Sequence, residues 1–386
     1  MTHEGHCRLG DLFTSRREKG RAGLPTLSVT LNDGLVNRED LDRKQDTTLS
    51  PEEHLFVKRG DIAYNMMRMW QGALGLATSD GMVSPAYVVL KPTTRVDPLY
   101  ASFLFKNRRL LYLFWAYSYG LTDDRLRLYP GDFARIPAFV PPISEQKGIA
   151  QSLVTWDIAI EKVSSLIRVK NLEKISLVRD LLSGSRRLPG FTNPWRKYRI
   201  CEMGRVISGG TPDTENQSYW GGEVLWATPT DIVSKVGRRI SGTERQISEA
   251  GLRASSATLL PAGSILFCSR ATIGELAIAA SEIATNQGFK NLIPSKKFDA
   301  DFLYYLFSAN KNRFVRLACG STFLELSKRD FERIDFTVPA RDEQDAIASC
   351  ITSVDDQISR LHEYLRCLNF EKAGLVQRLV SANLNK

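Results

Sequence analysis

The residue types that usually carry enzyme chemistry do not form a catalytic pattern in this sequence. The four histidines do not form the His-Glu-x-x-His arrangement that binds a catalytic zinc ion, and there is no glycine-rich segment of the kinds that bind dinucleotides or nucleoside triphosphates. Val140-Pro-Pro-Ile143 shares two prolines with the Asn-Pro-Pro-Tyr motif of amino-methyltransferases, but it lacks the amide that holds the target amino group. We therefore expect a protein that is not an enzyme and that uses no cofactor and no metal.

The composition is typical of a globular protein with more than one domain. The chain has 386 residues, of which 43% are hydrophobic and 25% charged, and this length is enough for two domains with separate cores. No apolar segment approaches the roughly 20 residues that span a bilayer, and the N-terminal residues lack the layout of a signal peptide, so we expect a cytoplasmic protein. The six cysteines lack a paired spacing, which predicts neither a disulfide nor a structural zinc site.

The positive charge is divided almost evenly along the chain. The net charge is +9, with 19 Lys and Arg against 16 Asp and Glu in residues 1–143, and 19 against 15 in residues 191–340. Two modest basic surpluses of this kind are compatible with two faces that contact phosphate groups. Many proteins that never bind nucleic acid have a similar balance, so the charge supports this interpretation only weakly.

The chain contains an internal repeat with a period of 198 residues. Gly131-Asp-Phe-Ala-Arg-Ile-Pro137 matches Arg329-Asp-Phe-Glu-Arg-Ile-Asp335, and Ile143-Ser-Glu-Gln146 matches Arg341-Asp-Glu-Gln344. Two copies of one structural plan are the usual reason for such self-similarity. We therefore expect two halves with the same fold.

A seven-residue hydrophobic repeat follows each matched segment. Apolar residues alternate at spacings of four and three, and they are Ile149, Leu153, Trp156, Ile160, Val163 and Ile167 in the first half and Ile347, Ile351, Val354, Ile358, Leu361 and Leu365 in the second. This spacing predicts two coiled-coil helices of about 38 residues, or roughly 57 Å each. Since the chain must return from the second repeat to the first, we expect the helices to pair in opposite directions. The alternative is two unrelated amphipathic helices, each packed on its own domain.

Each long helix is preceded by a segment of mixed periodicity. Short β-rich stretches at 86–90 and 263–268 alternate with turns, and residues 99–115 and 302–317 are expected to be helical. These patterns predict α+β domains whose first thirds differ and whose last thirds agree. The expected boundaries are 1–142 for the first globular domain, 143–188 for the first long helix, 189–339 for the second globular domain and 340–386 for the second long helix.

Short motifs in both halves carry a resemblance to a known family. The second half contains Ser208-Gly-Gly-Thr-Pro212, Tyr219-Trp220, Trp226-Ala-Thr-Pro-Thr-Asp231, Arg270-Ala-Thr-Ile-Gly274 and Asn286-Gln-Gly-Phe289. The first half contains Tyr64-Asn-Met-Met-Arg-Met-Trp-Gln71 and Val83-Ser-Pro-Ala-Tyr-Val-Val-Leu90. The long helices are preceded by Pro141-Pro-Ile-Ser-Glu-Gln146 and Pro339-Ala-Arg-Asp-Glu-Gln344. Through these motifs almost the whole chain resembles the specificity subunits of type I restriction-modification systems.

The resemblance implies a fold and a function. It implies an α+β protein with two globular target recognition domains, related by pseudo-two-fold symmetry and separated by a pair of long antiparallel coiled-coil helices. Such a subunit binds double-stranded DNA in a sequence-specific way and reads a bipartite target. The expected partners are two methyltransferase (modification) subunits and endonuclease (restriction) subunits, with no membrane involved.

Base recognition needs planar polar side chains aimed at base edges, with cations on phosphates. We expect these contacts from loop residues that the fold does not need for packing. The candidates in the first domain are Asn65, Arg68, Gln71, Ser84, Arg125 and Arg127. The candidates in the second domain are Thr211, Ser269, Arg270, Thr272, Asn286, Gln287, Lys290, Thr322 and Lys328.

Other interpretations of these residues and of the chain stay open. Asn286 and Gln287 can instead satisfy the backbone of a turn, and Arg270 can join a surface ion pair. The tryptophans at 70, 220 and 226 are more often core residues than DNA-stacking ones. The alternative functions are a coiled-coil adaptor that does not bind DNA, and a diverged DNA methyltransferase or nuclease.

Overall fold

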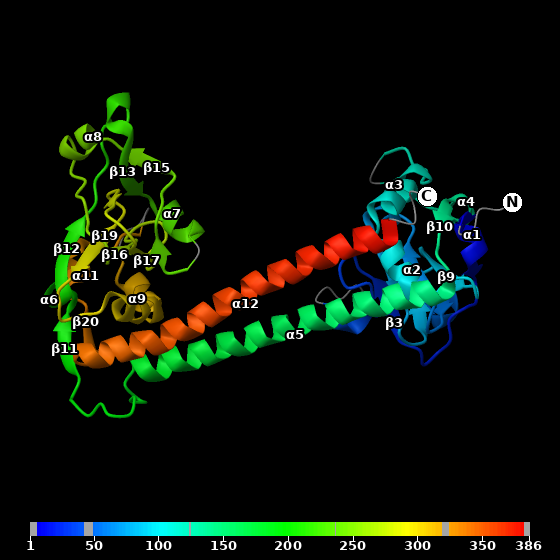
Figure 1. Cartoon of the computed structure of the whole chain (residues 1–386), viewed down its shortest axis with the longest axis horizontal. Coiled ribbons are helices and arrows are strands. Elements are labelled where there is room, and N and C mark those ends of the chain that lie inside the picture. The colour runs from blue at the N-terminus through cyan, green and yellow to red at the C-terminus, as the bar shows by residue number, and fades with distance from the viewer. Residues whose placement is uncertain (1–5, 42–48, 123–124, 236, 319–323, 382–386) are drawn as a thin grey trace. The chain divides into compact units, whose positions relative to one another are not determined.

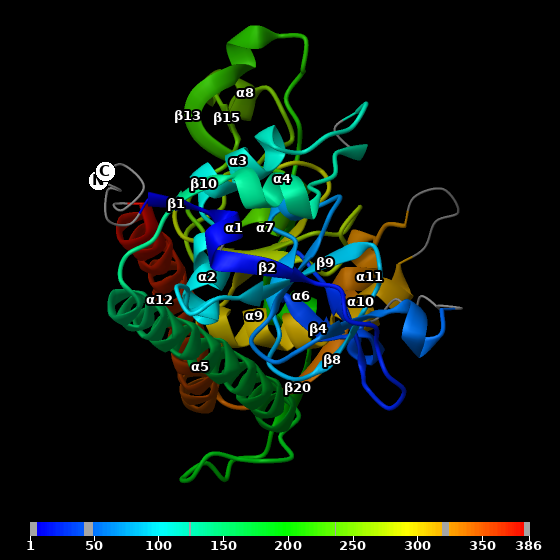
Figure 2. The ribbon, with the colours of Figure 1, turned by 90° about the vertical axis from the view of Figure 1, so that its right-hand side faces the viewer.

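The chain consists of two compact units, each built from a globular part and portions of two long helices. The computed structural model describes residues 6–41, 49–122, 125–235, 237–318 and 324–381. The first unit comprises residues 1–164 with 364–386, and the second comprises residues 165–363. Figures 1 and 2 show the ribbon in two views. No helix in these ranges is long and apolar enough to cross a membrane.

The first unit combines short strands with four short helices. Its strands are β1 (His6–Arg8), β2 (Phe13–Arg16), β3 (Thr26–Val29), β4 (Leu35–Asn37), β5 (Leu55–Val57), β6 (Ile62–Asn65), β7 (Leu74–Leu76), β8 (Gly81–Val83), β9 (Tyr87–Pro92) and β10 (Pro137–Phe139). Its short helices are α1 (Leu9–Leu12), α2 (Pro98–Leu104), α3 (Arg108–Ala116) and α4 (Pro130–Arg135). The strands form the sheets β2-β9-β6-β7, β4-β3-β8-β5 and β1-β10.

The second unit has a corresponding set of elements. Its strands are β11 (Arg196–Arg199), β12 (Gly204–Ser208), β13 (Trp220–Ala227), β14 (Arg239–Ile240), β15 (Arg245–Ile247), β16 (Ile265–Phe267), β17 (Leu276–Ala279), β18 (Ala284–Thr285), β19 (Lys290–Pro294) and β20 (Asp335–Val338). Its short helices are α6 (Ile200–Met203), α7 (Pro229–Ser234), α8 (Glu249–Arg253), α9 (Ala300–Ala309), α10 (Lys311–Leu317) and α11 (Lys328–Arg333). The sheets are β12-β19-β16-β17-β14, β15-β13-β18 and β11-β20.

The two units share one topology. The order β2-β9-β6-β7 in the first unit corresponds to β12-β19-β16-β17 in the second, and all of these neighbours are antiparallel. In the smaller sheet, β3 pairs with β8 in parallel and with β4 antiparallel, just as β13 pairs with β18 and β15. The expected duplication of one α+β plan is therefore confirmed.

The units differ mainly at the edges of these sheets. In the first unit β5 pairs with β8, whereas in the second unit β14 pairs in parallel with β17. The second unit also has an eight-residue β13 followed by α7, where the first unit has a four-residue β3. Different connections between matched strands leave the scaffold intact and change the loops that it presents.

The two helices expected at 99–115 and 302–317 are each interrupted, which corrects the sequence-based prediction. The first is divided into α2 and α3, and the side chain of Asn107 accepts a hydrogen bond from the backbone N–H of Arg109 at the start of α3. The second is divided at Asn310, whose amide donates to the carbonyl of Leu306 at 2.8 Å. Asparagine favours helix ends because its side chain competes for backbone groups.

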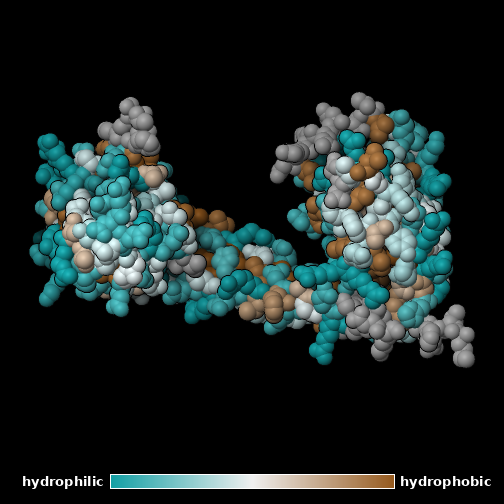
Figure 3. All heavy atoms as spheres, turned by 90° about the horizontal axis from the view of Figure 1, so that it is seen from above, coloured by the Kyte–Doolittle hydropathy of each residue, from teal (hydrophilic) through white to brown (hydrophobic). Residues whose placement is uncertain are grey.

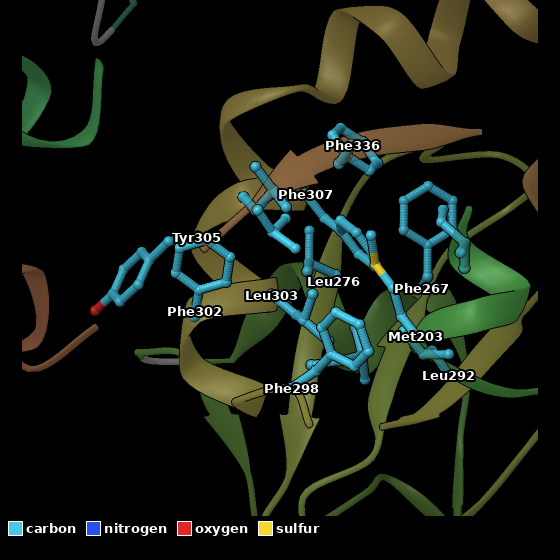
Figure 4. Close-up of a cluster of buried hydrophobic side chains, with 14 of the residues drawn as sticks. Met203, Phe267, Leu276, Leu292, Phe298, Phe302, Leu303, Tyr305, Phe307 and Phe336 are labelled. Atoms are coloured by element: carbon cyan, nitrogen blue, oxygen red, sulfur yellow. The ribbon is translucent and has the colours of Figure 1, made fainter. Parts of the chain in front are cut away.

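Matched phenylalanines form the centre of each core. In the first unit the rings of Phe105 and Phe114 lie 5.7 Å and 6.2 Å from that of Phe133. In the second unit Phe307 and Phe314 lie 6.2 Å and 6.0 Å from Phe331. Figure 4 shows part of the second core, where buried side chains from α9 meet those of β16, β17 and β19. Burial of such rings is the main source of stability for domains of this size.

The two long helices pair in opposite directions. They are α5 (Ile143–Leu182) and α12 (Arg341–Ser381). In the first unit Asp157 of α5 forms an ion pair with Lys372 of α12, and in the second unit Lys174 of α5 lies 2.6 Å from Asp355 of α12. The two positions are 17 residues apart along each helix, so both units have the same antiparallel register (Figures 1 and 2).

The heptad residues occupy this interface. None of the twelve side chains is exposed, and Leu153 and Ile351 are completely buried. The helix ends also follow the sequence signals, because Gly184 directly beyond α5 has a φ of 72°, the left-handed conformation that terminates helices. The expected antiparallel coiled coil is therefore confirmed.

A buried glutamine joins each long helix to its globular part. The amide oxygen of Gln146 accepts the N–H of Asp97 at 2.8 Å, and its amide nitrogen donates to the carbonyls of Arg95 and Pro141 at 3.0 Å and 2.8 Å. Asp97 in turn caps α2 by accepting the N–H of Tyr100. Because the Gln146 side chain is fully buried, no water can replace these three bonds.

The second unit repeats this connection in full. Gln344 accepts from the N–H of Asp299 at 3.0 Å and donates to the carbonyls of Lys297 and Pro339 at 3.3 Å and 3.0 Å. Asp299 caps α9 by accepting the N–H of Phe302. In each unit one glutamine amide therefore connects the first turn of a long helix with a residue just before that helix. The same amide also binds the segment that leads into a domain helix.

At the start of α12 the second unit also has an ion pair with no counterpart among the described residues at the start of α5. The carboxylate of Glu343 is 1% exposed and accepts from the guanidinium of Arg187 at 2.6 Å and 2.8 Å and from the indole N–H of Trp195 at 3.2 Å. The corresponding residue of the first unit, Glu145, is exposed. Arg187 lies in the linker that follows α5, and its bonds to Glu343 hold it against the start of α12.

Replacing Gln146 by Ala removes three hydrogen bonds and leaves their backbone partners unsatisfied. We expect a loss of about 2 to 4 kcal/mol in the free energy of unfolding. Gln344→Ala should have an effect of similar size, since its contacts are the same. Both are measured by urea denaturation followed by circular dichroism. The control is Gln151→Ala, an exposed position of α5, and a midpoint shift no larger than that of the control would contradict the assigned role.

Candidate nucleic-acid interface

Five loop segments of the second unit meet beside its strand ends, and we name them the second loop cluster: residues 209–212, 226–231, 268–274, 285–290 and 324–326. Gly210 donates its N–H to the carbonyl of Thr285 at 2.9 Å, and Asn286 donates to Ala227 at 3.1 Å. Ser269 lies between two other segments, because its N–H donates to Gly288 at 2.8 Å and its carbonyl accepts from Leu326 at 2.9 Å. Motifs that are far apart in the sequence thus form one surface.

The paired glycines of the first segment are required by this close approach. A Cβ atom at Gly209 would lie 2.0 Å from the carbonyl oxygen of Asn286, and one at Gly210 would lie 2.4 Å from the backbone N of Ala257. Contacts this short are impossible for any side chain. The Gly-Gly pair therefore lets the loop that carries Thr211 lie against the segment that carries Gln287.

Thr211 and Gln287 are the exposed polar pair of the second loop cluster. The hydroxyl of Thr211 donates to the amide oxygen of Gln287. The neighbouring Asn286 has the turn role considered above, since its side-chain oxygen accepts the N–H of Gly288 at 2.9 Å. The Gln287 side chain is exposed, and its amide oxygen is the acceptor in this bond.

Three charged residues lie together at the edge of the second loop cluster. Glu325 is 3.4 Å from both Arg270 Nε and Lys290 Nζ. The side chains of Arg270 and Glu325 are 43% and 38% exposed, whereas that of Lys290 is 8% exposed. Arg270 therefore has the ion-pair role considered above and can still reach solvent, while Lys290 faces the interior.

Other candidates of the second unit lie beneath or outside this surface. The hydroxyl of Ser269 is buried and donates to the carbonyl of Gly288 at 3.0 Å. The hydroxyl of Thr272 is buried beside the Cys268 thiol. Lys328 is exposed at the start of α11 and pairs with Glu332 at 3.7 Å. Thr322 lies outside the described residues.

The turn at 270–274 has an unusual backbone. Ala271 has a φ of 57°, and among the described residues it is the only non-glycine with a positive φ. Beside it, burial raises the pKa of the Cys268 thiol to about 12, so this thiol stays protonated at neutral pH. Strained residues of this kind concentrate where a loop must hold a side chain in one orientation, and here the neighbouring side chain is Arg270.

Aromatic residues flank the cluster on β13. Trp226 is 3% exposed, and its indole N–H donates to the carbonyl of Gly210 at 2.9 Å. Trp220 packs edge-on against it with ring centroids 5.0 Å apart. The guanidinium of Arg245, on β15, lies 3.7 Å from the centroid of Trp220. Trp226 is a core residue, Trp220 is partly buried against it, and Arg245 is an exposed cation that the sequence analysis missed.

The first unit has a corresponding set, which we name the first loop cluster: residues 65–73, 84–87 and 125–129. Between β6 and β7 the chain folds into a tight loop, in which Arg68 donates its N–H to the carbonyl of Asn65 at 3.1 Å and Gln71 donates to that of Arg68 at 3.0 Å. The side chain of Asn65 accepts the N–H of Met67 at 3.0 Å. Asn65 thus stabilises the loop, and the side chains of Arg68 and Gln71 are exposed.

The segment with Arg125 and Arg127 is attached to this loop. Leu128 donates its N–H to the carbonyl of Met66 at 2.9 Å, in the place of the Leu326 to Ser269 bond of the second unit. Arg127 exchanges two backbone hydrogen bonds with Tyr119 at 2.9 Å and 3.0 Å. The side chains of Arg125 and Arg127 are exposed, so two guanidinium groups lie next to the loop of Arg68.

Ser84 occupies the position of Asn286 in the other unit. It follows β8 as Asn286 follows β18, and its hydroxyl accepts the N–H of Ala86 at 3.3 Å. Trp70, nearby, packs against the core of the first unit. The turn is thus conserved in geometry between the units, although the side chain at its start differs.

Within each unit the structure therefore places most of the candidate residues in one loop cluster. It also shows which of them are exposed. The exposed or half-exposed ones are Asn65, Arg68, Gln71, Ser84, Arg125, Arg127, Thr211, Arg270, Thr272, Asn286, Gln287 and Lys328. The sequence analysis missed Glu325, although the repeat could have indicated it, because the position 198 residues earlier is Arg127. Among the described side chains, no group of three His, Cys, Asp or Glu residues could hold a metal ion.

Comparisons with known proteins find similar chains. Residues 192–366 match the model of the type I restriction modification DNA specificity domain. The MjaIX specificity subunit of Methanocaldococcus jannaschii is 37% identical over 166 residues, which cover 42% of this chain and 38% of that relative. A putative MjaX specificity subunit of the same organism is 21% identical over 365 residues, or 90% of this chain and 84% of the relative.

Solved structures show the same fold over nearly the whole chain. The HsdS subunit from Thermoanaerobacter tengcongensis has a TM-score of 0.55 at 15% identity, and the alignment covers 97% of this chain and 96% of that one. The S subunit from M. genitalium has a TM-score of 0.59 at 14% identity, with 98% and 97% covered. With its duplicated α+β units and its paired long helices, the chain is similar in fold to these specificity subunits, and its residues 192–366 match the DNA specificity domain of type I restriction modification.

Proposed function

We propose that this chain is the DNA-binding specificity subunit of a type I restriction-modification complex and has no catalytic activity of its own. Each loop cluster reads one half of a bipartite target in double-stranded DNA. The observation that carries this proposal is the repetition of one loop scaffold with different exposed side chains. Arg68, Gln71 and Arg127 occupy it in the first unit, and Arg270 and Gln287 occupy it in the second.

The exposed side chains have the chemistry that base reading needs. A guanidinium can donate two parallel hydrogen bonds to the O6 and N7 atoms of guanine, and a glutamine amide can pair with the N6 and N7 atoms of adenine. Both loop clusters contain at least one side chain of each type. Because the surrounding residues differ, the two units should prefer different half-sites.

The modest positive charge supports binding to the DNA backbone. Each globular segment carries a small excess of Lys and Arg over Asp and Glu, and the chain as a whole has a net charge of +9. Cations on phosphates give affinity without sequence information, so their contribution falls as salt rises. We expect the chain to act in the cytoplasm, where DNA is accessible to it.

The long helices offer a surface for partner subunits. Along α5, within the second unit, Leu166, Val169, Leu172 and Ile175 are between 44% and 68% exposed. Figure 3 shows hydrophobic residues on the surface of the paired helices. Exposed apolar stretches of this kind usually mark protein interfaces. We propose that modification subunits dock on this stretch and that restriction subunits join the complex through them.

The first test is DNA binding by the purified full chain. We expect binding to random duplexes whose log affinity falls linearly with log salt, with a slope of about −0.9 for each phosphate contacted. When the chain is combined with its modification subunit, mapping of methylated bases should give a motif split by an unread gap. Salt-independent or absent binding would favour the adaptor alternative, and a continuous motif would contradict two separate readers.

The second test assigns each loop cluster to one half of the target. Gln71→Ala should relax selection in one half only, and Gln287→Ala in the other half only, each by about 1 to 3 kcal/mol per affected base pair. Selection of preferred duplexes from a randomised pool measures this. Lys162→Ala, an exposed cation on α5, is the control and should leave both halves unchanged. Loss of both halves in either glutamine variant would refute the assignment.

The third test concerns the docking stretch. The double substitution Val169→Asp and Leu172→Asp places two charges on an apolar surface, so we expect the modification subunit to bind at least about 10-fold more weakly. Co-purification and titration by calorimetry measure this. The matched control changes the exposed polar residue Glu173 to Gln on the same helix. DNA binding by the chain alone should not change, and an unaltered affinity for the modification subunit would place its docking site elsewhere.

A further inference from the structure

Among the described residues, Glu325 is the one acidic residue that forms ion pairs with the cations of the second loop cluster. These cations are Arg270 and Lys290. Glu325 is 3.4 Å from each of the two cations. Its position is fixed by the backbone, because it pairs with Arg270 as an isolated bridge and the next residue, Leu326, donates to Ser269 at 2.9 Å. A carboxylate is thus built into a surface whose proposed ligand is a polyanion.

Lys290 helps to hold the Glu325 carboxylate in place. The Lys290 side chain is 8% exposed, and Glu325 is its ion-pair partner. A buried ammonium group without a counter-ion is strongly unfavourable, so this pair holds one side of the Glu325 carboxylate toward the interior. The other oxygen, Oε2, faces Arg270.

Arg270 is held by Glu325 at its Nε atom and not at the two terminal nitrogen atoms of the guanidinium. Glu325 approaches the Nε atom, and the structure gives the guanidinium no other ion pair among the described residues. Both terminal nitrogen atoms therefore remain available for an end-on pair of hydrogen bonds to a guanine. With 43% of its side chain exposed, Arg270 forms only a weak pair with Glu325, which a change in the loop or in the ligand can release.

The first unit lacks this arrangement at the same positions. The repeat of 198 residues aligns Glu325 with Arg127, which is exposed. The matched strands β9 and β19 align Lys290 with Val88, which is buried in the core. The carboxylate and the buried cation thus occur together in one unit and are both replaced in the other. The shared scaffold therefore does not need Glu325.

We propose that Glu325 is a positioning residue that determines specificity in the second unit, an inference that rests on the proposed function. Its carboxylate directs Arg270 toward base edges and repels phosphates that approach without the correct base. In target DNA the guanidinium gains its end-on bonds, which outweigh the repulsion. On other DNA the same carboxylate lowers the affinity. Glu325 therefore acts mainly against non-target sequences.

The test compares affinities of full-length variants for a random duplex and for the duplex selected by the wild-type chain. In Glu325→Gln the released Arg270 can contact a phosphate, so we expect random-duplex affinity to rise about 10-fold at roughly 50 mM salt and the salt slope to steepen by about 0.9. Affinity for the selected duplex should stay the same or fall. The ratio between the two affinities is the decisive quantity.

Two further variants keep the test decisive if the single change disturbs folding. Lys290→Met combined with Glu325→Gln removes both charges of the inner pair together, and it should show the same loss of selectivity with a circular dichroism melting curve close to that of the wild type. Adding Arg270→Ala to Glu325→Gln should cancel the gain on random DNA. The control, Glu371→Gln, removes an exposed carboxylate of α12 and should change either affinity less than twofold.

The possible results separate this inference from the proposed function. If the wild-type chain binds no duplex, the proposed function fails. If it binds and selects DNA but the Glu325 variants change both affinities by the same factor or leave both unchanged, Glu325 has only a structural role and the inference is overturned. The inference is also overturned if Arg270→Ala does not cancel the gain.

Discussion

The structure depends on one buried side chain that occurs twice. Gln146 and Gln344 each satisfy one backbone N–H and two backbone carbonyls, at the point where a long helix leaves its globular part. An amide is suited to this task because it offers a donor and an acceptor group in one plane. Apolar contacts restrict the direction of a helix much less than such directional bonds do. The direction of the coiled-coil helix is therefore linked to the strands and helices that support the loops.

Each unit combines a frame, by which we mean the parts that are the same in both units, with loops whose side chains differ. The frame consists of matched sheets and a matched group of phenylalanines, such as Phe133 and Phe331. The proposed DNA-reading segments are loops between matched strands, and they are held by corresponding backbone hydrogen bonds in both units, such as those of Leu128 and Leu326. Because backbone bonds do not depend on the side chain, the residues at these loops can change without disturbing the fold. A duplicated frame can in this way present two different surfaces to DNA.

Much of the fold could be predicted from the sequence, whereas the site could be predicted only in part. The 198-residue repeat and the heptad residues from Ile149 to Ile167 indicated two like halves and an antiparallel coiled coil, since these patterns reflect local periodicity and burial. The interruption of the domain helices at Asn107 and Asn310 was not predicted, because an apolar helical pattern continues across both residues. Candidate site residues were chosen by type, and type alone does not separate the buried Ser269 from the exposed Gln287.

The sequence by itself determined the duplication, the class of each half, the long helices and the absence of a known catalytic motif. Only the tertiary structure decided which polar residues share a surface and which of them lie inside it. The physical reason is that helices and heptads arise from contacts between residues close in sequence, while the loop clusters arise from contacts across as many as 76 residues. The pairing of Glu325 with Arg270 and with the buried Lys290 is such a contact. Its chemistry depends on burial, which no spacing along the chain reveals.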